Sequence, residues 1–250
     1  MKRRTLLQGI VATSAFSVRS FAYAQSAADT EPFGFALEHR TDRRDAPIVY
    51  FVRDVTPEAL ERLYATMQKA APDVIGGKVA IKMSFESDAA PRLDPALVGV
   101  LAKKTDATLI DNNVYSARRD NAKDHRELAR DHGYAAVAPI DILDADGDME
   151  LPITGGVILK HAMTGKHFAD YDSVISLVRF KPHYLPRYGG TLKNLSICMG
   201  SLAGKAWIHS GGKVSSHYVY SDENTTSQAM ADAAKGAVDA KKNRWMFFNV

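Results

Sequence analysis

Residues 78–110 read KVAIKMSFESDAAPRLDPALVGVLAKKTDATLI, and this stretch gives the strongest indication of the fold. Its two apolar runs, residues 78–83 and 108–110, are typical of buried strands. Between them, Asp94-Pro95 is a typical helix start, because Asp caps free amide groups and Pro suits the first helical position. The order of strand, helix and strand predicts a parallel pair of strands joined by a helix.

The same alternation continues on both sides of this stretch. It predicts an α/β fold: a mostly parallel sheet with flanking helices in a single domain over residues 46–250. A core-type strand lies at the very end of the sequence, where a loop would normally follow. Either this strand completes the sheet or the domain is incomplete at its C-terminus, and the family resemblance described below favours an incomplete domain. Further strands are expected at residues 48–52, 140–143, 157–159, 173–178 and 245–248, and further helices from Thr56-Pro57, over 120–131 and over about 224–240.

The composition is that of an ordinary globular protein, with 46% hydrophobic and 24% charged residues among 250. These values exclude wholesale disorder, collagen and coiled coil. The net charge of +3 depends on four basic residues in the first 24, which contain no acid, so no nucleic-acid partner is expected. The one cysteine, Cys198, excludes an internal disulfide, a four-cysteine zinc site and an all-cysteine iron–sulfur cluster held by this chain alone.

The first 24 residues are predicted to be a signal peptide. Arg3-Arg4, followed by Thr5-Leu6-Leu7, resembles the twin-arginine export signal, and Ala22-Tyr23-Ala24 is a suitable cleavage site. The alternative is an ordinary secretory signal that contains two arginines. Either way we expect a periplasmic or otherwise exported protein without stable membrane insertion after cleavage, and the first alternative makes the twin-arginine export machinery a partner. Residues 25–45 are polar and aperiodic, which predicts a flexible linker.

Residues with useful chemistry follow the predicted strands. Lys82 lies near the end of one strand, and Asp111 and Asn113 follow the next. Ligands of open α/β sheets bind beyond the carboxyl ends of the strands, where a lysine can bind an anion and Asp or Asn can bind a cation or orient a polar substrate. Each has a plainer interpretation as an exposed edge lysine or as a turn-forming residue.

His125 and His132 are seven residues apart in the predicted helix 120–131 and its end, and so lie roughly on one face. They are candidates for ligand binding or proton transfer. The alternative is a solvated helix face, on which His132 interacts with the helix dipole.

The densest group of candidates lies in residues 180–209, after the predicted strand 173–178. Lysines supply positive charge there, and glycines let the backbone approach a ligand. Gly200 to Lys205 is not a phosphate-binding Walker loop, because the spacing is one residue short and Ala206 replaces the Ser or Thr. Cys198 has apolar neighbours, so we expect a buried hydrophobic residue and not a nucleophile. The candidates are Lys181, His183, Gly189, Gly190, Lys193, Asn194, Lys205 and His209.

Three blocks of motifs carry a resemblance that covers nearly all of residues 45–250: Lys-x-Ser-Phe-Glu from Lys82, Asp-Asn-Asn-x-Tyr to His-Gly-Tyr over residues 111–134, and Phe-Lys-x-His to His-Ser over residues 180–210. Together they resemble the domain-of-unknown-function family 362, whose members are often labelled uncharacterised iron–sulfur centre proteins. Ser84 stands where many members have His, and Pro182 where many have Gly. The resemblance makes these positions characteristic of the family: Lys82, Asp111, Asn113, His125, His132, Lys181, His183, Gly189, Gly190, Lys193, Asn194, Gly204, Lys205 and His209.

The resemblance also implies a redox-type or cofactor-binding protein. Family members usually continue past a strand such as residues 245–250 into a cysteine-containing segment, and some add a ferredoxin-like module. An iron–sulfur cluster is therefore implied for a longer form, with ligands outside this chain, since Cys198 is the only cysteine here.

Two functions remain open from the sequence. The first is an exported redox or cofactor-binding protein, in one version an oxidoreductase-type enzyme, with a pocket for a small anionic ligand. Lys82, Lys181, Lys193 and Lys205 would hold the negative charge, His183 and His209 would transfer a proton or bind metal, and Asp111 would orient one histidine. The second is a non-catalytic periplasmic protein that binds an anion or a metal. Strongly shifted pKa values among the pocket residues would favour the first function.

Overall fold

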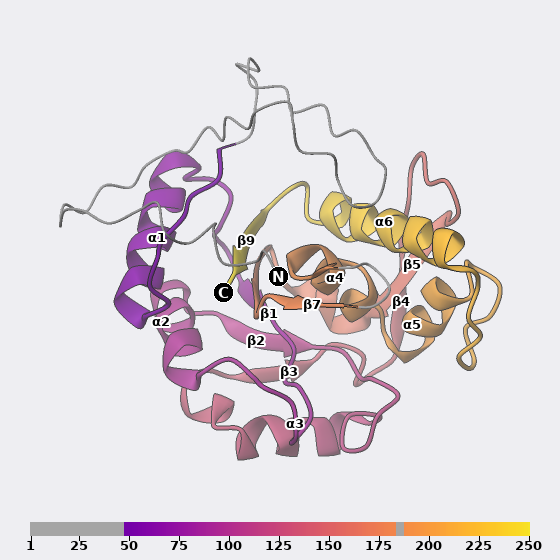
Figure 1. Cartoon of the computed structure of the whole chain (residues 1–250), viewed down its shortest axis with the longest axis horizontal. Coiled ribbons are helices and arrows are strands. Elements are labelled where there is room, and N and C mark those ends of the chain that lie inside the picture. Colours follow the sequence, from indigo (N-terminus) through magenta and orange to yellow (C-terminus); the bar gives the residue numbers. More distant parts are fainter. Residues whose placement is uncertain (1–47, 184–187) are drawn as a thin grey trace, which may run out of the picture. The chain divides into compact units, whose positions relative to one another are not determined.

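A five-stranded parallel sheet organises the unit Val55–Val250 of the computed structural model (Figure 1). The strand order is β3-β2-β1-β6-β9, which confirms the predicted α/β fold. The structure describes residues 48–183 and 188–250, so the predicted signal peptide (1–24) and linker (25–45) lie outside the described residues. The strands are β1 Val79–Lys82, β2 Thr108–Asp111, β3 Ile140–Ile142, β6 Ser173–Val178 and β9 Trp245–Asn249.

The strand order reverses at β1, which pairs with β2 on one side and with β6 on the other. In register, Ile81 lies opposite Leu109 of β2 and Ile175 of β6. The chain builds β1, β2 and β3 in one direction and then returns to add β6 and β9 on the other side. In such sheets the crevice beyond the carboxyl ends at the reversal is where ligands bind.

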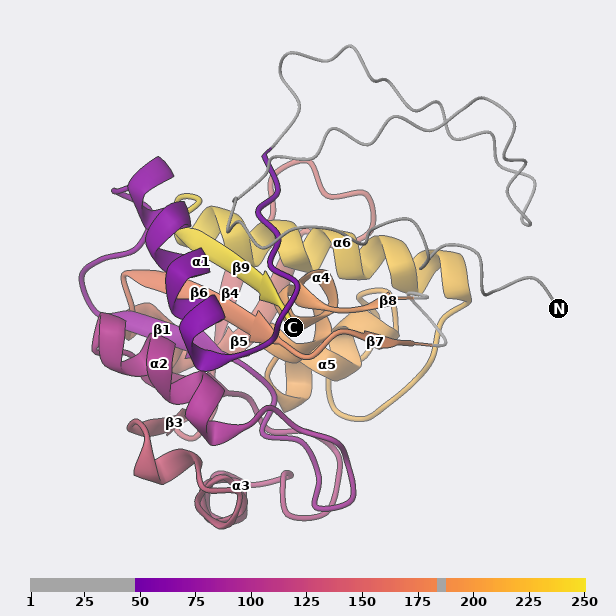
Figure 2. The same ribbon diagram turned by 60° about the vertical axis from the view of Figure 1, so that its left-hand side comes forward.

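Helices cover both faces of the sheet, as the two clusters of buried side chains show. α1 (Pro57–Ala70) and α2 (Pro95–Thr105) pack on one face, and α6 (Glu223–Ala240) packs on the other with α5 (Leu202–His209). Figure 2 shows α1 and α2 side by side. The predicted caps are confirmed, since Thr56 Oγ1 accepts from Ala59 N at 3.2 Å and an Asp94 carboxylate oxygen accepts from Ala96 N at 2.8 Å. The remaining helices are α3 (Ala122–Asp131), α4 (Thr191–Leu195) and the 3-10 turns η1 (Tyr134–Ala136), η2 (Lys166–Asp170) and η3 (Ile197–Met199).

Two predicted strands are wrong. Residues 48–52 form no strand, and the side chains of Ile48, Val49 and Phe51 are exposed. Residues 157–159 form no strand either, because their backbone N–H groups donate to the carboxylate of Asp232 in α6, at 2.6–3.0 Å. An apolar run alone does not tell which partner will satisfy its backbone.

Several elements were not predicted. β4 (Asp148–Pro152) and β5 (His161–Gly165) form an antiparallel hairpin, and β7 (Lys181–Pro182) pairs with β8 (Tyr188–Gly189). The stretch 180–209, expected as a loop, also contains α4 and α5. α5 packs so closely on β5 that a Cβ atom at Gly204 would lie 2.0 Å from the Met163 carbonyl oxygen. This contact accounts for a glycine at position 204 by packing alone.

Within the described residues, no helix combines the length and the hydropathy that a bilayer-spanning segment requires.

Candidate functional site

A cavity of about 250 Å³ lies beyond the carboxyl ends of β1, β2 and β6. Ser84 follows β1, Asp111 ends β2 and Val178 ends β6, and all three line the cavity. The position is the one that the reversal of strand order favours for ligands. The structure therefore brings together segments that are far apart in the sequence. Of the predicted site residues, the following line this cavity: Asp111, Lys181, His183, Gly189, Gly190, Lys193, Asn194, Lys205 and His209.

Lys82 lies beneath the cavity and does not line it. Its side chain is fully buried, and Nζ donates to Asp111 Oδ1 at 2.9 Å, to Asn194 Oδ1 at 3.0 Å and to the Met83 carbonyl at 2.9 Å. An ammonium group has three hydrogens, so these three acceptors use all of its donors. Lys82 was predicted to bind the ligand, and in the structure it neutralises Asp111 instead.

Asp111 is held as a carboxylate by the groups around it. Burial alone would raise the pKa of Asp111, but the charges of Lys82, His125 and Lys205 outweigh burial and hold the pKa well below its usual range. The histidine beside Asp111 is His125, whose Nε2 lies 3.5 Å from Oδ2, whereas the sequence placed His183 or His209 in this position. A carboxylate that stays ionised orients neighbouring groups and does not act as a proton donor.

Asn194 of α4 ties two strands together below the cavity. Its amide nitrogen donates to the Lys82 carbonyl of β1 and to Ser176 Oγ of β6, both at 3.0 Å. Its amide oxygen accepts from Lys82 Nζ, so every polar atom of this side chain is used. Lys82, Asp111 and Asn194 therefore form a buried polar floor, a name kept below for these three residues.

Lys205 of α5 also lines the cavity. Its Nζ donates to the carbonyls of Asn113 and Gly200, at 2.6 and 2.5 Å. Burial lowers the pKa of Lys205 to about 8, although the Asp111 charge acts in the opposite direction. Asn113 was predicted to bind the ligand, but it supports Lys205 through its backbone carbonyl and does not line the cavity.

The cavity has more positive than negative charge that is left uncompensated. Its two acids are Glu86, which pairs with Lys181 at 2.9 Å, and Asp111, which pairs with Lys82. Arg119 and Lys193 also line the cavity, and no carboxylate of the described residues pairs with either. The buried Nε of Arg119 has no hydrogen-bond partner in the described part of the chain.

Arg119 was missing from the predicted site. The sequence shows Arg118-Arg119 directly after the Asp111 segment, but it does not show which arginine faces inward. In the structure Arg118 turns outward and pairs with Asp88 and Asp131, which leaves Arg119 for the cavity. Two adjacent loop residues point in different directions here. The Arg118-Arg119 pair is therefore the sequence signal that could have indicated an arginine at the cavity.

His183 and His209 both line the cavity and are both kept neutral at neutral pH. Burial, followed by the charges of Lys193 and Lys181, lowers the pKa of His183. Burial, with the charges of Lys193, His183 and Lys205, lowers the pKa of His209 to about 4. The buried Nδ1 of His209 has no hydrogen-bond partner among the described residues. A neutral imidazole beside cationic groups can accept a proton.

Two tyrosines complete the cavity, and Tyr218-Val219-Tyr220 itself is the one sequence signal that could have indicated them. The ring centroid of Tyr218 lies 5.0 Å from that of His209, and the centroid of Tyr220 lies 4.9 Å from it. The two tyrosine rings stack with 5.8 Å between centroids. Aromatic rings therefore line the cavity together with the charged groups.

We expect the free energy of unfolding to fall as pH falls from about 6.5 towards 4. His209 titrates at about 4 in the folded chain and at its ordinary 6.5 when unfolded, so the unfolded chain takes up protons first and is favoured. His183 contributes in the same direction. Urea unfolding across this range should show a shallower decline for His209→Gln than for the unchanged chain.

The matched control is His217→Gln, because His217 is exposed and outside the cavity. The free energy of unfolding of His217→Gln should fall with pH as that of the unchanged chain does. Parallel curves for all three proteins would contradict the effect assigned to His209.

The described residues contain no cluster of three His, Cys, Asp or Glu side chains arranged to hold a metal ion. His132 is engaged elsewhere, with Nδ1 2.9 Å from the Phe85 carbonyl and Nε2 3.2 Å from Asp88. Cys198 is partly exposed and lines the cavity, which corrects the expectation that it is buried. An iron–sulfur cluster needs several cysteine ligands, and one cysteine in the sequence does not fit that group.

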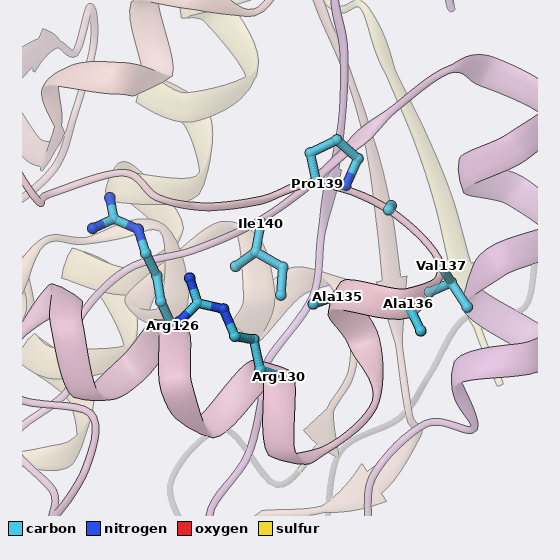
Figure 3. A pocket seen from close by; sticks show the side chains of 8 residues that line it. Arg126, Arg130, Ala135, Ala136, Val137, Pro139 and Ile140 are labelled. Carbon is cyan, nitrogen blue, oxygen red and sulfur yellow. The ribbon is translucent and has the colours of Figure 1, made fainter.

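A second hollow, a groove of about 560 Å³, lies between α3 and residues 135–140 (Figure 3). Arg126 and Arg130 of α3 line it together with small apolar residues. Ile140 begins β3, so this groove lies at the amino end of that strand. None of the predicted site residues lines the groove, and the cavity at the carboxyl ends is the better candidate site.

Comparison with known proteins gives a family but no described activity. The model of a family described as "Domain of unknown function (DUF362)" matches residues 79–249. No curated protein matches the chain. A crystal structure of a protein from Thermotoga maritima is similar with a TM-score of 0.45 and 10% sequence identity, over 77% of this chain and 50% of that one. The chain thus spans about half the length of that protein.

Proposed function

The chain belongs to the DUF362 family, and from that premise we propose that it binds a small anionic ligand in the cavity beyond β1, β2 and β6. The observation that carries the proposal is the uncompensated positive charge of Arg119 and Lys193. Positive charge that no carboxylate balances favours an anionic ligand. An anion in the cavity would balance the charge of both side chains.

The arrangement suits a ligand with carboxylate or phosphate oxygens. Arginine offers several donors in a fixed plane, which match two oxygens of one anionic group. Lys193 and the remaining donor of Lys205 would add charge from α4 and α5. The Lys181–Glu86 pair borders the cavity without adding net charge.

Catalysis is a second candidate function, favoured by the state of His209. His209 lines the cavity, its buried Nδ1 has no hydrogen-bond partner among the described residues, and burial and neighbouring cations keep the ring neutral. The proposed role is a general base toward an anion held by Arg119 and Lys193, with Lys205 as a nearby proton donor whose pKa of about 8 lies close to neutrality. Shifted pKa values inside one cavity support an enzyme over a passive binding protein.

We also propose that the protein works outside the cytoplasm, as a periplasmic or otherwise exported protein. The support is the sequence of residues 1–24, with Arg3-Arg4 and Ala22-Tyr23-Ala24. A redox role rests on the family resemblance of the sequence alone, and no step is assigned to a cluster in this chain.

Anion binding is tested by titration calorimetry with inorganic phosphate, sulfate and acetate. We expect at least one of these anions to bind, and Arg119→Gln and Lys193→Met each to weaken it by about tenfold or more, because each removes a charge-assisted contact. Thermal unfolding of both variants should stay close to that of the unchanged chain, since neither side chain is part of the buried polar floor.

Arg126→Gln is the matched control, because Arg126 lines the other groove. It should leave the affinity unchanged. Absence of binding by all three anions, or equal losses in Arg119→Gln and Arg126→Gln, would contradict the proposed function.

A further inference from the structure

The cavity is lined by two chemically different groups of side chains. Arg119, Lys193 and Lys205 form the cationic group. Tyr218, Tyr220, Ile197 and Met230 form the aromatic and apolar group. A small inorganic anion would use only the cationic group.

The aromatic residues of the cavity are held in place by contacts with other rings of this chain. The Tyr218 ring contacts the rings of Tyr115, His209 and Tyr220, with centroid distances of 4.5, 5.0 and 5.8 Å. The backbone is anchored nearby, because Ser221 N donates to the His209 carbonyl at 2.8 Å. Rings that are already packed lose little freedom on binding.

Tyr220 leaves much of its ring uncovered. The residue is 63% exposed, although its ring stacks on Tyr218 at an interplanar angle of 20° and it lines the cavity. Aromatic rings prefer offset stacking or edge contacts with another ring, so a flat ligand group has a favourable position here.

The volume agrees with a ligand larger than an inorganic anion. An apolar cavity of about 150 Å³ is large enough for benzene. The cavity of about 250 Å³ therefore has room for one ring and an anionic group attached to it. His209 contacts both tyrosine rings, and its Nδ1 has no hydrogen-bond partner among the described residues.

From this juxtaposition we infer that the ligand is an aromatic compound bearing a carboxylate or phosphate group. The anionic group lies against Arg119 and Lys193, and the ring lies against Tyr218 and Tyr220. The inference rests on the proposed anion binding and adds the class of ligand. It makes Tyr220 a specificity-determining residue that acts on the ring alone.

The test compares pairs of ligands that differ only in the ring: phenyl phosphate with methyl phosphate, and benzoate with acetate. In calorimetric titrations, we expect the aromatic member of at least one pair to bind about tenfold more tightly. Tyr220→Ala should remove most of that preference and leave the affinity for the non-aromatic member unchanged. Arg119→Gln should weaken both members alike.

Val219→Ala is the matched control, since Val219 is exposed and does not line the cavity. Circular dichroism of each variant confirms that it is folded before titration. Equal affinities within both pairs would overturn the aromatic inference and leave anion binding intact. If the preference for the aromatic ligand remains in Tyr220→Ala, the role assigned to Tyr220 is overturned. No binding by any of the four ligands would overturn the proposed function and the inference with it.

Discussion

Replacing Lys82 with methionine is expected to lower the free energy of unfolding by about 3–5 kcal/mol. The substitution removes the cation that lies 2.9 Å from the Asp111 carboxylate, whose side chain is 3% exposed. It also leaves Asn194 Oδ1 and the Met83 carbonyl without their donor. Losing one partner of a buried ion pair is far more costly than losing a surface charge. Urea unfolding followed by circular dichroism measures the loss.

Lys193→Met is the matched control, because it makes the same chemical change on the rim of the same cavity. It should cost less than about 1 kcal/mol, as surface substitutions generally do. The double variant Lys82→Met/Asp111→Leu should recover part of the loss, since no isolated charge remains buried. A loss below about 1 kcal/mol for Lys82→Met would show that the buried polar floor does not stabilise the fold.

Replacing Asp232 with leucine is expected to cost about 3 kcal/mol. The carboxylate of Asp232 accepts hydrogen bonds from three consecutive backbone N–H groups, those of Val157, Ile158 and Leu159. Leucine would leave these donors without an acceptor, at about 1–3 kcal/mol for each one that water cannot reach. Urea unfolding gives the total, and hydrogen exchange at residues 157–159 should speed up in the variant.

Asp239→Leu serves as the comparison on the same helix, because Asp239 is exposed and pairs with Lys235. Its cost should be below about 0.5 kcal/mol. The loss of unfolding free energy in Asp232→Asn should lie between those of Asp232→Leu and Asp239→Leu, since the amide keeps one acceptor oxygen. Equal stability of Asp232→Leu and Asp239→Leu would refute the role given to Asp232.

The parts of the fold that could be predicted are those with local causes. Capping by Thr56 and Asp94 depends on neighbours two or three residues away, and the strand at Ser173–Val178 has four apolar residues among its six. Residues 157–159 carry the same kind of apolar signal. Their hydrogen-bond partner is Asp232, more than 70 residues away, and nothing in the run itself indicates it.

The candidate site also has a part that could be predicted from the sequence and a part that could not. Its location followed from topology, since the candidates came after strands whose carboxyl ends meet at one edge. The role of Lys82 could not be predicted from topology, because it is set by Asp111 and Asn194, which are 29 and 112 residues away. The choice between Arg118 and Arg119 depends in the same way on Asp88 and Asp131, which draw Arg118 outward.

The Asn194 contacts have a practical consequence for anyone who wishes to redesign this pocket. The Asn194 amide joins two strands and accepts a hydrogen bond from Lys82, so the buried polar floor is part of the folded framework. Single substitutions in the buried polar floor are therefore expected to destabilise the fold. Arg119, Lys193 and Tyr220 share no hydrogen bond with those three residues among the described contacts. A library that randomises only these upper positions would retain most of its members as folded proteins while sampling new ligands.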